Sequence, residues 1–141
     1  MTEISFYTFA DNKLTVARQL TAKAFSRGMQ VMLYTPDAAL ANTLDMMLWT
    51  TPALSFLPHC RDVHPFASET PVLIGENADV LPQADLMINL HHERPPAFSR
   101  FGRLLEIVST DTDDIEQGRQ RYRFYRERGY ALTTVDLRNS A

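Results

Sequence analysis

Strand-like and helix-like segments alternate through the first fifty residues, and this alternation constrains the fold more than any other feature. Residues 4–9 have a strand-forming composition, and residues 13–27 carry apolar side chains every three or four positions before Gly28. A second apolar run, residues 30–34, precedes a second helix that opens at Pro36. A helix that joins two strands of one sheet lets them run parallel with a right-handed crossover. The pattern predicts an α/β fold.

The rest of the chain extends this pattern. Residues 50–71 contain four prolines and lack a sustained period, so they are predicted to form a long ordered loop with room for one short strand. Further strands are expected at residues 71–75, 85–90 and 103–108, a long helix at 110–128, and a final edge strand at 130–137. The prediction is one three-layer domain over residues 1–141, with a mostly parallel central sheet, helices on both faces and a Rossmann-like topology.

The composition restricts the cellular compartment and the binding partners that we expect for this chain. A net charge of -3 gives no global attraction to nucleic-acid phosphates. Cys60 is the only cysteine, so no intramolecular disulfide forms and a reducing compartment is expected. The N-terminus lacks the pattern of a signal peptide, and no segment approaches the roughly 20 apolar residues of a membrane span. A cytoplasmic protein without a membrane-embedded part is expected.

The motifs of nucleotide binding and catalysis are missing from the sequence. The turn after the first strand, residues 8–13, contains no glycine, and neither G-x-G-x-x-G nor a Walker lysine motif occurs. His91, His92 and Glu93 follow a strand, where a metal or acid–base site is conceivable. Because adjacent residues of an extended chain point to opposite faces, a polar loop is expected there instead. No glycine-bounded turn of the kind that presents a catalytic nucleophile surrounds Cys60. No catalytic residue, cofactor or metal is predicted.

The last predicted helix carries the most informative surface. Between residues 119 and 128 it has five arginines against one acid, Glu127. A solvated basic face is one interpretation. The other is a pocket for an acidic peptide with an apolar end, in which guanidinium groups bind carboxylates and an apolar stripe buries a side chain. The stripe and its flank consist of Ile115, Gly118, Tyr122 and Tyr125, edged by Arg119 and Arg126.

Residues 48–59 (LWTTPALSFLPH) form a motif of tryptophan, phenylalanine and prolines at fixed spacing. This motif resembles the L-W-x-x-P-x-x-S-F-x-P-H motif of the chi subunit family of bacterial DNA polymerase III holoenzyme. Flanking features agree with that family in their order, so the resemblance extends from residue 4 to about residue 136. These features are Phe6-Tyr7, the strand 85–90 followed by Phe98, the strand 106–108, and the aromatic and arginine positions from 121 to 129.

The resemblance implies a non-catalytic accessory subunit of the clamp-loader assembly. Members of this family pair with the psi subunit and, on a different surface, bind the acidic C-terminal tail of single-stranded DNA-binding protein. Such a subunit links the replisome to coated single-stranded DNA. Carried over to this chain, the resemblance implies a tail pocket formed by Trp49, Phe56, Val108, Arg119 and Tyr122.

The chain departs from the family at one pocket position. A lysine of the family's tail pocket aligns with Ile115 here. Either Arg126 or Arg123 compensates for the missing charge, or the tail is bound about tenfold more weakly. No motif places the residues that contact psi.

Two other functions stay open on the residues alone. His91, His92 and Glu93 would serve a small nucleotide- or metal-dependent hydrolase, and the helix containing residues 119–128 would serve direct binding of single-stranded DNA. The acidic net charge argues against high-affinity binding of nucleic acid without a partner protein.

Overall fold

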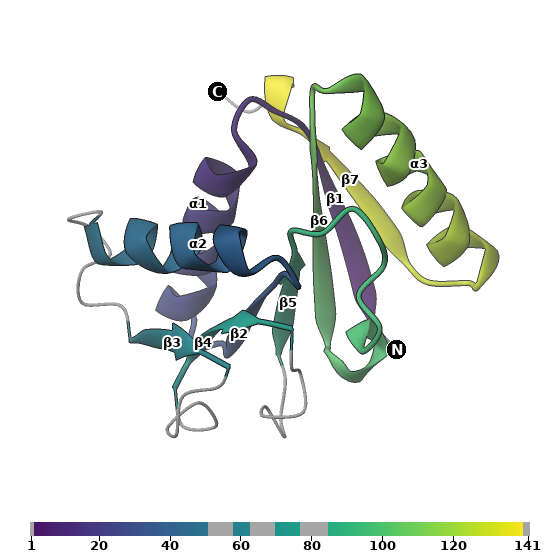
Figure 1. The fold of residues 1–141 in the computed structure, drawn as a ribbon. Coiled ribbons are helices and arrows are strands. Elements are labelled where there is room, and N and C mark those ends of the chain that lie inside the picture. The colour runs from purple at the N-terminus through teal and green to yellow at the C-terminus, as the bar shows by residue number, and fades with distance from the viewer. Residues whose placement is uncertain (1, 51–57, 63–69, 77–84, 140–141) are drawn as a thin grey trace.

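The predicted alternation of strands and helices is confirmed by a computed structural model, which describes residues 2–50, 58–62, 70–76 and 85–139 (Figure 1). The short strand expected within the proline-containing segment lies at residues 59–61. The elements are β1 (Glu3–Ala10), α1 (Lys13–Ser26), β2 (Val31–Tyr34), α2 (Ala38–Thr50), β3 (His59–Arg61), β4 (Val72–Gly75), β5 (Leu86–Asn89), η4 (Phe98–Arg100), β6 (Arg103–Ser109), α3 (Thr112–Glu127), β7 (Leu132–Asp136) and η5 (Leu137–Asn139).

The strands form one seven-stranded sheet in the order β3-β4-β2-β5-β6-β1-β7. Every pairing among these described strands is parallel. Strands β2, β4 and β5 are buried at each of their positions, which explains why their sequences are continuous apolar runs. Strand β7 lies at the edge, as predicted, and its side chains are partly exposed.

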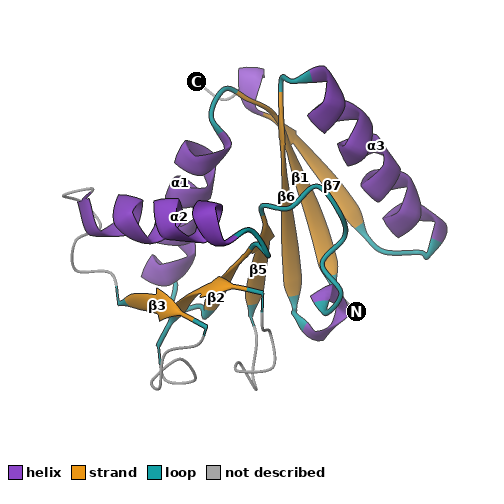
Figure 2. Cartoon of the chain, viewed as in Figure 1, coloured by secondary structure: helices purple, strands orange, loops and turns teal. Residues whose placement is uncertain are grey.

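Helices cover both faces of the sheet, which confirms the three-layer prediction (Figure 2). Helices α1 and α2 pack on one face through small and aliphatic residues such as Ala17, Ala41 and Leu44. Helix α3 covers the other face, where Tyr125 packs among Ile4, Phe6 and Leu104. None of the helices in the described part of the chain combines the length and the apolar composition needed to cross a membrane.

Helix α1 begins and ends where the sequence indicates. The side chain of Asn12 accepts hydrogen bonds from the backbone N–H groups of Leu14 and Thr15, which caps the helix. Gly28 follows the helix with a φ of 74°, a left-handed conformation that glycine adopts without steric cost.

A buried polar network fixes α3 to the sheet. Glu106 of β6 has no exposed surface and accepts hydrogen bonds from Arg121 Nε at 3.1 Å, Tyr125 Oη at 2.7 Å and Asn89 Nδ2 at 2.9 Å. Burial raises the pKa of Glu106, while the charge of Arg121 and the hydrogen bonds from these donors act in the opposite direction. Arg121 Nη1 also donates to the carbonyl oxygen of His92 at 2.6 Å. The network thereby sets the position of α3 over β5 and β6.

Candidate functional site

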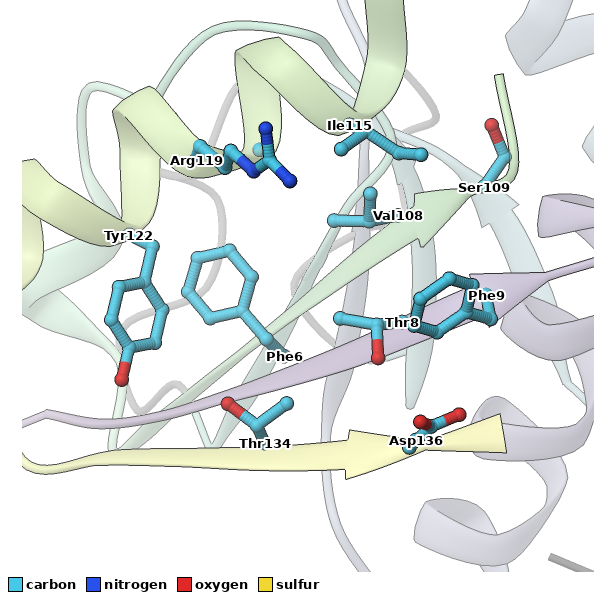
Figure 3. A pocket seen from close by; sticks show the side chains of 11 residues that line it. Phe6, Thr8, Phe9, Val108, Ser109, Ile115, Arg119, Tyr122, Thr134 and Asp136 are labelled. Atoms are coloured by element: carbon cyan, nitrogen blue, oxygen red, sulfur yellow. The ribbon is translucent and has the colours of Figure 1, made fainter. Parts of the chain in front are cut away.

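A pocket of about 460 Å³ lies between α3 and the edge of the sheet formed by β6, β1 and β7. Figure 3 shows α3 on one side of it and the strands on the other. The pocket exists because α3 covers β6 and leaves the outer strands β1 and β7 open beside it. Its lining residues are Phe6, Thr8, Phe9, Val108, Ser109, Ile115, Gly118, Arg119, Tyr122, Thr134 and Asp136.

The floor of the pocket is apolar and closely packed. The rings of Phe6 and Tyr122 meet edge to face, with 5.2 Å between their centroids. Val108 lies beneath Gly118, and a Cβ atom at residue 118 would stand only 2.8 Å from Val108 Cγ2. Helix α3 therefore approaches β6 this closely only because residue 118 has no side chain. The floor suits an aliphatic or aromatic side chain of a ligand.

One end of the pocket is formed by an irregular turn of β1. The pairing of β1 with β6 shifts register between Tyr7 and Ala10, and Phe9 adopts a φ of 60°. This left-handed conformation is uncommon for a bulky residue and brings both Thr8 and Phe9 to the pocket. The guanidinium group of Arg138 lies 3.5 Å from the centroid of the Phe9 ring.

The acidic residue at this end of the pocket, Asp136, already forms an ion pair. Arg138 Nη2 donates to Asp136 Oδ2 at 2.7 Å and Arg138 Nε donates to Asp136 Oδ1 at 3.1 Å. The hydrogen bonds from Arg138 hold the pKa of the Asp136 carboxyl group below its ordinary value. Asp136 is thus a carboxylate at neutral pH, and its pairing already occupies the guanidinium group of Arg138 at this end.

The opposite side of the pocket is cationic. Arg119 is exposed, and among the described residues no acid forms an ion pair with it. Arg123 and Arg126 are also exposed and follow on the same flank of α3, because positions four and seven residues apart share a helix face. The pocket therefore combines an apolar floor with an open basic border.

The junction of β6 and α3 is held by Asp114. Its Oδ2 accepts a hydrogen bond from the backbone N–H of Ser109 at 2.7 Å, and its Oδ1 lies 3.3 Å from Lys13 Nζ. Burial acts to raise the pKa of Asp114, but the hydrogen bond from Ser109 and the charge of Lys13 outweigh it and lower the pKa. This junction positions the first turn of α3, which contributes Ile115 to the pocket.

Four of the predicted site residues meet in this pocket: Val108, Ile115, Arg119 and Tyr122. Arg126 lies further along α3, outside the lining. Phe56 lies outside the described residues.

The structure does not bring Trp49 to the pocket. Helix α2 continues to Thr50, and the Trp49 ring packs against His59 of β3 with 4.6 Å between ring centroids. Strand β3 is the far edge of the sheet, four strand spacings or about 19 Å from β6.

Sequence reasoning missed the contribution of the strands to the pocket. The parallel pairing of β1 with β7 sets Phe6 beside Thr134 and Thr8 beside Asp136. The two-residue period of β1 places Phe6 and Thr8 on one face, and this signal was readable in the sequence. Which strand lies next to β1 depends on the topology, and a single sequence does not specify it.

The loop after β5 also differs from expectation. Residues 91–93 form a bend instead of the extended chain that was assumed. One ligand atom each from His91, His92 and Glu93 consequently lies within 4.8 Å of the others. Cys60 is partly buried in β3, and the buried imidazole of His59 lies 3.3 Å from Asp45 Oδ1.

Comparison with known proteins finds relatives of similar sequence and others of similar fold. The family model of the DNA polymerase III chi subunit, HolC, matches residues 1–133. A DNA polymerase III subunit chi from Pseudomonas aeruginosa is 37% identical over 136 residues, which cover 94% of this chain and 94% of that protein. The corresponding subunit from Haemophilus influenzae is 31% identical over 137 residues, covering 94% of this chain and 95% of its own.

Proteins with little sequence similarity to this chain also have a similar fold. The C-terminal domain of the DEAD-box protein Dbp5 superposes with a TM-score of 0.64 at 14% identity, over 98% of this chain and 92% of that one. Identity this low supports a common fold and nothing further. The family match, by contrast, spans nearly the whole sequence. The chain belongs to the DNA polymerase III chi subunit family.

Proposed function

We propose that this chi-family chain tethers the clamp-loader assembly to single-stranded DNA-binding protein, whose acidic C-terminal tail binds in the α3 pocket. The observation that carries the proposal is the combination of an apolar floor with Arg119, which has no ion-pair partner among the described residues. A peptide with carboxylates and an apolar end matches both features. The chain holds its partner in place and performs no chemistry on it.

The charges give the bound tail a direction. Carboxylates of the tail lie near Arg119 and not at the other end, because the charge of Arg138 there is already taken by Asp136. The apolar terminal side chain is buried against Phe6, Val108 and Tyr122. Burial of one such side chain contributes about 1.5–3 kcal/mol. Because the carboxylates meet exposed guanidinium groups, binding weakens as salt concentration rises.

The departure from the family at residue 115 changes the proposed site but does not abolish it. Ile115 extends the apolar floor where the family resemblance implies a lysine. Arg123 and Arg126 lie on the same flank of α3 and supply positive charge along the path of the tail. The tail therefore depends more on Arg119 and on apolar contacts in this chain.

We place the docking of the psi subunit on another surface. Met46 and Trp49 are exposed by 66% and 60%, and they are the exposed large hydrophobic residues of the described part of the chain. Both belong to α2, at the far edge of the sheet from the tail pocket. Aromatic and methionine side chains are typical of interface cores. Separate surfaces let the chain hold both partners at once.

Calorimetric titration with the cognate tail peptide tests the proposal. Arg119→Ala and Tyr122→Ala should each weaken binding at least about tenfold, since each removes a central contact. Arg27→Ala, at an exposed arginine just beyond α1, is the matched control and should leave the affinity unchanged. Trp49→Ala should leave peptide binding unchanged and reduce co-purification with psi. No binding by the wild-type chain, or full binding by both pocket variants, refutes the tail site.

A further inference from the structure

The bend after β5 gathers three side chains with metal-binding atoms. His91 Nε2 lies 3.7 Å from Glu93 Oε2, and His92 Nε2 lies 3.9 Å from Glu93 Oε1. One ligand atom from each of the three residues lies within 4.8 Å of the other two. The tail pocket is lined by none of these residues.

The backbone of the bend is held at each of the three positions. Asn89 Oδ1 accepts a hydrogen bond from the backbone N–H of His91 at 2.9 Å, and Asn89 Nδ2 donates to the carbonyl oxygen of Glu93 at 3.1 Å. Arg121 Nη1 donates to the carbonyl oxygen of His92 at 2.6 Å. Asn89 and Arg121 are themselves buried and bound to Glu106. The bend therefore exists before any ion binds.

Two imidazole nitrogens and one carboxylate oxygen form a donor set suited to a divalent transition ion such as Zn²⁺. Bond lengths of about 2.0–2.2 Å place tetrahedral ligands about 3.3 Å apart. The two histidine nitrogens here stand 3.7 and 3.9 Å from the Glu93 carboxylate, each from a different oxygen. Binding therefore requires side-chain rotations that bring the three ligand atoms, now within 4.8 Å of one another, to this spacing. We propose that His91, His92 and Glu93 form a Zn²⁺-class binding site on the surface of this chain.

The positively charged side chains near the bend do not prevent Zn²⁺ from binding. The charge of Arg121 is offset by Glu106, whose Oε1 lies 3.1 Å from Arg121 Nε. The guanidinium group of Arg94 lies 3.5 Å from the centroid of the Phe124 ring. The side chains of His92 and Glu93 are 53% and 74% exposed. An ion held by three ligands keeps an open position there for water or for a donor from another protein.

Titration of the full, tag-free chain with ZnCl₂ in a calorimeter tests the site. We expect one ion per chain with a Kd in the micromolar range, since three ligands at an exposed bend bind less tightly than a closed four-ligand site. His92→Ala and Glu93→Gln should each weaken binding about tenfold or more. Both residues are exposed, so the variants should fold. Glu116→Gln, at an exposed acid of α3, is the control and should bind as the wild type does.

The imidazole resonances of the chain provide a second measurement. Zn²⁺ should shift the ring signals of His91 and His92 and leave those of His59 in place. Absence of binding up to high micromolar Zn²⁺ overturns the proposal. So does binding that is undiminished in both His92→Ala and Glu93→Gln, because the ion would then lie elsewhere on the chain.

Discussion

Glu106→Gln should destabilise the fold strongly, although it changes one oxygen to a nitrogen. The wild-type carboxylate is completely buried and accepts hydrogen bonds from Arg121, Tyr125 and Asn89. Arg121 is 3% exposed, so its guanidinium group cannot turn to water when its counter-charge is lost. Removing one partner of such a pair leaves an uncompensated buried charge, at a cost of about 3–5 kcal/mol.

The effect is measurable by urea denaturation and by thermal unfolding. For a chain of 141 residues, a loss of this size lowers Tm by about 10–20 °C. Arg121→Met should be destabilising as well, since it leaves Glu106 without its cation. The double variant should be less destabilised than the sum of the two, because with both partners neutral neither leaves an uncompensated charge buried.

A loss below about 1 kcal/mol for Glu106→Gln would refute this reasoning. It would mean that the pair is effectively solvated and behaves like a surface ion pair. Strict additivity in the double variant would show that Glu106 and Arg121 do not interact energetically. Lys13→Ala removes a more exposed ion pair with Asp114 and serves as the comparison, with an expected loss of at most about 1 kcal/mol.

Three further predictions concern the pocket and its borders. Gly118→Ala should weaken binding of the tail peptide, because the new Cβ would stand 2.8 Å from Val108 and push α3 off β6; calorimetry against wild type measures the change. Ile115→Lys should tighten the same binding by up to about tenfold at low salt, and an equal gain at high salt would contradict an electrostatic cause. The lowered pKa of Asp114 contributes stability above the pKa of the unfolded chain, and this is lost as pH falls through the folded pKa. Asp114→Asn should therefore flatten the acid side of a plot of unfolding free energy against pH, and an unchanged slope would contradict the argument.

The fold was predictable because its signals are local. The apolar runs of β2, β4 and β5 report complete burial, and the periodic residues of α1 end at Gly28. Strand order is different in kind. It places β7 beside β1, and these two strands are far apart in sequence. The apolar period that identifies a strand or a helix carries no information on which strands pair.

The part of the pocket that one helix supplies was predictable. Ile115, Arg119 and Tyr122 share a face of α3 by helical spacing alone, and the structure brings all three to the pocket. Trp49 could not be placed by the same reasoning, because its position depends on where α2 ends and on which strand it covers. The bend at residues 91–93 was missed because it is imposed by Asn89 and Arg121, which are distant from each other in sequence.

The arginines of α3 and of its C-cap show why composition alone overestimates the positive charge that a helix offers to a ligand. Arg121 points into the protein and is neutralised by Glu106, and Arg128 lies 4.2 Å from the Phe124 ring centroid. Arg119 lines the α3 pocket, and Arg123 and Arg126 are exposed on the same face of the helix. The positive charge available to a ligand is thus smaller than the sequence suggests and is gathered beside an apolar floor. Such an arrangement favours a short acidic peptide over an extended phosphate backbone, which needs cations spread along its path.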